Sequence, residues 1–96
     1  MLIKLGVSIR NIKRPIRRTL SPIAKVFKKY GEEAVITSTV EGNHSASSLH
    51  YEGLAVDIRL PVNNLQAIMK DLRLELNGDY DIILEASHFH VEYDPH

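Results

Sequence analysis

Residues 54–76, LAVDIRLPVNNLQAIMKDLRLEL, contain the clearest succession of secondary-structure patterns in the chain. The opening run, LAVDIRL, is mostly apolar and predicts a strand that Pro61 ends. A helix is predicted over residues 62–76, because apolar side chains recur there on one helical stripe: Leu65, Ile68, Met69, Leu72 and Leu76. The Asn-Gly pair at residues 77–78 ends this helix. Such a succession indicates a domain that combines strands with helices.

Further elements are expected before and after this strand and helix. They are a helix over residues 21–30, a strand over 34–39, a polar loop over 41–52, and strands over 81–84 and 88–93. The first helix has Ser21 as its expected N-cap and Pro22 at its first helical position. Residues 1–20 show no clear period. We therefore expect an α+β fold with one antiparallel sheet of three to four strands and two helices on one face.

The length of 96 residues allows one domain with one modest core. We expect a basic amino-terminal segment over residues 1–20 and a single domain over residues 21–96. No apolar run approaches the ~20 residues that a transmembrane segment needs. Arg10, Lys13 and Arg14 interrupt the first residues too early for a signal peptide, so no export signal is expected. Because the chain has no Cys, disulfides, thiolate metal sites and cysteine nucleophiles are excluded.

Charge divides the chain in two. Residues 1–30 carry nine basic side chains and no acidic one, whereas residues 31–96 carry three basic and twelve acidic side chains. This asymmetry indicates either an anionic partner, such as a cell-wall polymer bound through residues 4–29, or neutralisation of one part by the other. Stacking aromatic residues are not arranged in a useful pattern among these basic residues, so no nucleic-acid partner is expected.

Histidines and one carboxylate in an apolar strand are the candidates for chemistry. His50 precedes Asp57 by seven residues, and His88 and His90 point to the same face of their expected strand. Asp57 interrupts an apolar strand, where a carboxylate is costly unless it is paired, hydrogen-bonded or bound to a metal. Two histidines and a carboxylate make a catalytic zinc site when Cys is absent. The alternative is an Asp57–arginine ion pair with histidines scattered on the surface.

Residues 48–58, SLHYEGLAVDI, resemble the S-x-H-x-x-G-x-A-x-D motif of the zinc D-alanyl-D-alanine metallopeptidases. That family is grouped with lysostaphin-type enzymes and the hedgehog signalling domain. The H-x-H signature of the group is similar to His88-Phe89-His90. The resemblance covers residues 34–93, with both motifs in the family's order. It implies a hedgehog/D-Ala-D-Ala metallopeptidase-like fold with a Zn²⁺ site.

The resemblance implies three zinc ligands: His50, Asp57 and His90. It implies Glu85 as the general base and His88 as a second catalytic group, acting as a base or as a donor to the oxyanion. His44 is either a hydrogen-bond donor to the substrate or a free loop histidine. Glu85 precedes His88 by three residues instead of four, and in members with an acid-x-x-His motif His88 would replace His90 as the ligand. The third ligand therefore stays open, whereas Glu92 is expected to be solvated.

By this resemblance the chain is a zinc metallopeptidase, a carboxypeptidase or endopeptidase. It would hydrolyse D-amino-acid-containing stem or cross-link peptides of peptidoglycan through a metal-activated water. Its size and the absence of a signal suit a bacteriophage-type member, released from the host cytoplasm to the cell wall or carried on the virion. Because the hedgehog domain keeps the zinc site but acts as a ligand, a binding or structural module with a non-catalytic zinc is the alternative. The scissile bond and the oligomeric state stay open.

Overall fold

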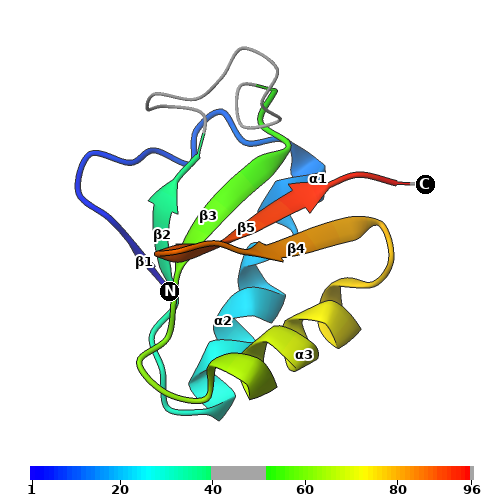
Figure 1. Cartoon of the computed structure of the whole chain (residues 1–96). Coiled ribbons are helices and arrows are strands. Elements are labelled where there is room, and N and C mark those ends of the chain that lie inside the picture. Colours follow the sequence, from blue (N-terminus) through cyan, green and yellow to red (C-terminus); the bar gives the residue numbers. More distant parts are fainter. Residues whose placement is uncertain (40–51, 96) are drawn as a thin grey trace.

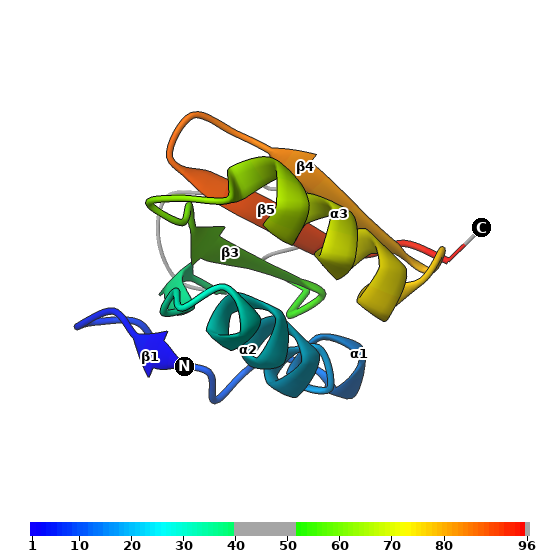
Figure 2. The same ribbon diagram turned by 90° about the horizontal axis from the view of Figure 1, so that it is seen from below.

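The computed structural model describes residues 1–39 and 52–95. Its elements are β1 (Leu2–Ile3), α1 (Arg14–Arg17), α2 (Leu20–Lys29), β2 (Val35–Ser38), β3 (Ala55–Arg59), α3 (Leu65–Leu76), β4 (Tyr80–Leu84) and β5 (His88–Tyr93). The strands form one sheet in the order β1-β2-β3-β5-β4. The two longer helices, α2 and α3, cover one face of this sheet (Figure 1, Figure 2). The α+β class is thus confirmed. No helix in the described part of the chain is long and apolar enough to cross a membrane.

The sheet differs from the expected one in size and in type. It has five strands instead of three to four, and it is mixed instead of antiparallel. The additional strand, β1, pairs in parallel with β2 through Leu2 with Val35 and Ile3 with Ile36. A strand of two residues is too short to show the alternation by which strands are predicted from sequence. The other neighbouring strands are antiparallel.

The topology brings the two sequence motifs together. Helix α3 carries the chain from β3 to β4, and β5 then returns between these two strands. As a result, β5 lies directly beside β3, although α3 and β4 separate them in sequence (Figure 1). The register of this pair places Asp57 opposite His90 and Arg59 opposite His88.

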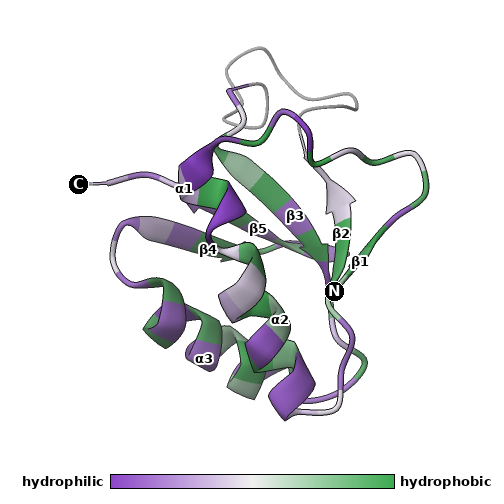
Figure 3. Cartoon of the chain, turned by 180° about the vertical axis from the view of Figure 1, so that it is seen from behind, coloured by the Kyte–Doolittle hydropathy of each residue, from purple (hydrophilic) through white to green (hydrophobic). Residues whose placement is uncertain are grey.

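The hydrophobic core lies between the sheet and the helices. Four core side chains of β3 and β5 are fully buried: Val56, Ile58, Phe89 and Val91. Phe89 meets Phe27 of α2 edge to face, with ring centroids 6.4 Å apart and an interplanar angle of 81°. Both α2 and α3 carry apolar as well as hydrophilic residues along their length (Figure 3). This is typical of helices that pack one side against a sheet and expose the other. Since strand residues alternate between faces, Asp57, His88 and His90 point away from these helices.

Residues 1–20 contribute to the same core. Ile12 and Ile16 are 5% and 0% exposed and belong to the main hydrophobic cluster. The Tyr80 hydroxyl of β4 donates a hydrogen bond to the Pro15 carbonyl over 2.7 Å, and the Arg18 guanidinium donates to the Tyr80 oxygen over 2.8 Å. The basic residues of this segment are therefore interspersed with side chains that anchor it to the sheet.

The first long helix begins earlier than predicted. Thr19, and not Ser21, stands at the N-cap of α2, and its carbonyl accepts a hydrogen bond from the Ile23 amide over 3.0 Å. The short helix α1 leads almost directly into α2, so the chain is already turning before Ser21. Pro22 lies in the first turn, where a missing amide proton costs no helical hydrogen bond.

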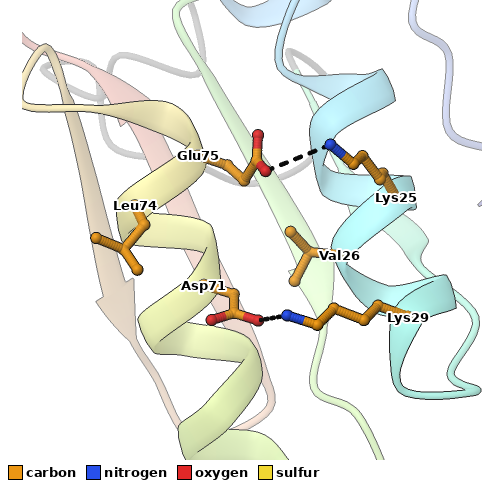
Figure 4. Close-up of a pocket in the computed structure, with 6 residues that line it drawn as sticks. All are labelled: Lys25, Val26, Lys29, Asp71, Leu74 and Glu75. Carbon is orange, nitrogen blue, oxygen red and sulfur yellow. Dashed lines mark hydrogen bonds and ion pairs between the residues drawn. The ribbon is translucent and has the colours of Figure 1, made fainter.

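Part of the charge asymmetry is neutralised where α2 packs beside α3. Lys29 Nζ lies 2.9 Å from Asp71 Oδ2, and Lys25 Nζ lies 3.5 Å from Glu75 Oε1 (Figure 4). These pairs border a groove of about 430 Å³ between the helices, beside the exposed side chain of Leu74. The basic amino-terminal part of the chain therefore pairs with the acidic part at this helix interface.

Candidate metal centre

Asp57 and His90 lie opposite each other on the face of the sheet that is turned away from α2 and α3. The Asp57 Oδ1 and His90 Nδ1 atoms are 3.0 Å apart. Asp57 is 7% exposed, and the His90 side chain is 15% exposed. A carboxylate buried to this degree needs a partner, and the imidazole across the strand pair supplies one. This contact joins a residue of the first motif to a residue of the second.

The charges around His90 favour its protonated form. The hydrogen bond with Asp57 raises the pKa of His90 above its ordinary value, burial acts in the opposite direction, and the negative charges of Asp57 and Glu92 add to the rise. A positive charge is therefore stabilised between Asp57 and Glu92. A metal cation at this place would be attracted by the same carboxylates.

The Asp57–His90 geometry also suits two ligands of one metal ion. Zinc binds imidazole nitrogen and carboxylate oxygen at about 2.0–2.2 Å, which places two tetrahedral ligand atoms roughly 3.3 Å apart. The observed 3.0 Å separation of Asp57 Oδ1 and His90 Nδ1 is close to this value. Both donor types are ones that zinc accepts, so these two of the three expected ligands fit the metal.

His88 and Glu85 lie next to this pair, where β4 turns into β5. His88 Nε2 is 3.6 Å from Asp57 Oδ2 and 3.9 Å from Glu85 Oε1. The Glu85 amide donates a hydrogen bond to the His88 carbonyl over 2.9 Å, which closes the turn. The Glu85 side chain is 47% exposed and the His88 side chain 26%. The structure therefore brings together four of the expected site residues: Asp57, Glu85, His88 and His90.

The other two expected site residues, His44 and His50, lie outside the described residues. The glycine of the first motif, Gly53, belongs to the described residues. Gly53 has a φ of +75°, and a Cβ atom there would lie 2.5 Å from the Asn11 carbonyl oxygen. Its own carbonyl accepts a hydrogen bond from the Lys13 amide over 2.9 Å. The motif is thus anchored to the amino-terminal segment at Gly53.

Glu92 is the residue of this site that the sequence patterns did not reveal. They predict a solvated side chain, but its Oε1 lies 3.0 Å from His90 Nε2, and the side chain is only 18% exposed. A signal is present in the sequence, because residues two apart on a strand share a face. This signal is easily missed, because a glutamate in an alternating strand is usually a solvent-facing residue.

An acidic group adjoins the site. Asp81, Glu92 and Asp94 bring carboxylate oxygens within 4.8 Å of one another, the one three-residue group of metal-ligand type found within residues 1–39 and 52–95. Its members are partly buried. The group offers oxygen donors alone, whereas the Asp57–His90 pair offers the mixed oxygen and nitrogen donors expected for zinc.

Comparison of the sequence with protein-family models finds no match, and a search of curated proteins finds no match either. The family resemblance therefore rests on the two motifs themselves. The contact between Asp57 and His90 is a geometric observation that is independent of that resemblance.

Proposed function

We propose that this protein is a zinc-dependent peptidase of the D-alanyl-D-alanine metallopeptidase type. The observation that carries the proposal is the 3.0 Å contact between Asp57 Oδ1 and His90 Nδ1, with His88 and Glu85 beside it. It unites residues from two separate motifs on one face of the sheet, and their oxygen and nitrogen donors are ones that zinc accepts. The proposed ligands are His50, Asp57 and His90.

A zinc ion held by these residues would lower the pKa of a bound water to about 7 and polarise the scissile carbonyl. Glu85 is proposed to accept the proton of the attacking water and to deliver it to the leaving amine. Its side chain is 47% exposed, and its Oε1 atom lies 3.9 Å from His88 Nε2.

His88 is proposed to donate a hydrogen bond to the oxyanion that develops on the scissile carbonyl. Its Nε2 atom, the proposed donor, lies 3.6 Å from Asp57 Oδ2 and 3.9 Å from Glu85 Oε1, next to the proposed ligands. A well-placed donor of this kind contributes roughly 3–4 kcal/mol to transition-state stabilisation. His44 is proposed as a further donor because of the family resemblance alone.

The proposed substrates are peptidoglycan stem or cross-link peptides that contain D-amino acids. Basic residues within 4–29 that are exposed on the surface, such as Lys4, Lys13 and Arg14, would add attraction to an anionic cell-wall polymer. The proposal includes a bacteriophage-type role, with release from the host cytoplasm to the wall or carriage on the virion.

The decisive experiment compares wild type with Glu85→Gln. Both proteins are loaded with zinc, and the release of amino groups from purified peptidoglycan is measured. We expect one zinc per chain in both and amine release by the wild type alone, because the variant keeps the proposed ligands but lacks the proposed base. Zinc binding without release by either protein would refute the peptidase and favour the binding or structural module.

A further inference from the structure

We infer that Glu92 is a positioning residue of the metal centre, which holds His90 so that its Nδ1 atom faces the metal beside Asp57. The inference rests on the proposed function, since it concerns the same site. Its basis is a chain of three side chains on one face of the sheet. His90 Nδ1 lies 3.0 Å from Asp57 Oδ1, and His90 Nε2 lies 3.0 Å from Glu92 Oε1.

The chemistry of imidazole makes the Glu92 contact decisive. A neutral imidazole, the form that binds a metal, carries a proton on one nitrogen and a lone pair on the other. Both ring nitrogens of His90 face a carboxylate that accepts a hydrogen bond, Asp57 at Nδ1 and Glu92 at Nε2. A metal ion shared by Asp57 and His90 would replace the proton on Nδ1, and the remaining proton would stay on Nε2, where Glu92 accepts it. Glu92 thereby holds the ring with Nδ1 toward Asp57 when the two residues share a metal ion.

The position of Glu92 in the sheet also suits a residue that orients His90. It lies within β5, an inner strand of the sheet, between Ala55 of β3 and Asp81 of β4. Its side chain is 18% exposed, and its Oε1 atom lies 3.0 Å from His90 Nε2. Carboxylates that hold the second nitrogen of a ligand histidine orient the ring and increase its basicity.

The neighbouring His88 lacks this arrangement. Its Nδ1 atom lies 3.0 Å from the Ser87 hydroxyl, which can either donate or accept a hydrogen bond and so does not select a tautomer. Its Nε2 atom is 3.6 Å from Asp57 Oδ2, farther than the His90 contact. The Glu92 contact therefore favours His90 as the third ligand, the choice that the sequence left open.

The test measures Zn²⁺ affinity of the full chain by competition with a chromophoric chelator. Glu92→Leu should weaken zinc binding roughly 10- to 100-fold, the usual effect of losing such a partner. Glu92→Gln should keep most of the affinity, because its side-chain oxygen still accepts the Nε2 proton. This rescue separates positioning from a general effect on structure. Thermal unfolding of the zinc-free variants checks that each one folds.

Asp81→Asn and Asp94→Asn are the matched controls, since each removes a carboxylate next to Glu92 without touching the described contact with His90. We expect both to bind zinc like the wild type. If they weaken binding as much as Glu92→Leu does, the ion lies in the acidic group and the inference is wrong. Wild-type affinity in Glu92→Leu would overturn it as well.

The inference and the proposed function can fail separately. A wild type that binds zinc and releases no amine refutes the peptidase, while the affinities of the Glu92 variants still decide the positioning role. An active wild type with unchanged affinity in Glu92→Leu retains the peptidase and rejects the inference. A wild type that binds no zinc overturns both.

Discussion

At Gly53, two separate constraints meet in one residue of the first motif. Its φ of +75° lies in the left-handed region, and a Cβ atom would approach the Asn11 carbonyl oxygen to 2.5 Å and the Lys13 amide nitrogen to 3.2 Å. The glycine therefore serves both the turn before β3 and the contact with the amino-terminal segment. Asp57 lies four residues farther along the chain, so the position of this turn bears directly on the site.

We expect Gly53→Ala to lower the free energy of unfolding by about 1–3 kcal/mol or more, because it adds a steric clash to the strain of a positive φ. Gly31→Ala is the matched control, since Gly31 has a φ of +72° and a Cβ atom there would meet no heavy atom within 4 Å. Urea unfolding measures both. Equal destabilisation by the two substitutions would contradict the close approach at Gly53.

At the scale of elements, α2 and α3 are joined by charge as well as by apolar packing. Tyr30, at the C-cap of α2, donates its hydroxyl proton to Asp71 Oδ2 over 2.7 Å, and Lys29 Nζ lies 2.9 Å from the same oxygen. These hydrogen bonds, led by that of Tyr30, hold the pKa of Asp71 below its ordinary value. The ionised carboxylate is thus the form that the folded helix pair favours.

The sign of the pH dependence follows from this lowered pKa. The contribution of Asp71 to stability is fully present above its ordinary pKa of about 3.9 and is lost as the pH falls through the lower value of the folded state. We expect the stability difference between wild type and Tyr30→Phe to be constant above about pH 5 and to shrink toward lower pH. Urea unfolding across this range tests it. The shrinkage should disappear in an Asp71→Asn background, and its persistence there would assign the effect to another group.

The start of α3 shows where element prediction from sequence reaches its limit. The periodicity predicts a helix from residue 62, but α3 begins at Leu65. The carboxylate of Glu32 accepts hydrogen bonds from the Val62 amide over 2.9 Å and the Asn63 amide over 3.1 Å, and Asn64 has a φ of +63°. A partner about thirty residues away in sequence thus holds these residues in a turn. Local periodicity carries no information about such a contact.

At the scale of the whole molecule, the apolar periods of residues 54–76 were sufficient to predict the α+β class. The part played by residues 1–20 in the core was not predictable, because Ile12 and Ile16 stand among basic residues without a recognisable period. For the candidate site, the motifs predicted Asp57, Glu85 and the histidine pair, which the fold brings close together. They could not show that β5 returns beside β3, and the Glu92–His90 contact depends on that arrangement.

The central claim is that one zinc ion is held by residues of both motifs. X-ray absorption at the zinc edge of the zinc-loaded protein tests it directly, because imidazole ligands give a distinctive multiple-scattering pattern. We predict a four-coordinate zinc with two imidazole nitrogens and oxygen ligands at about 2.0–2.1 Å. His90→Ala should remove one imidazole from this pattern. A shell of oxygen atoms alone would place the metal among Asp81, Glu92 and Asp94 and would contradict the account.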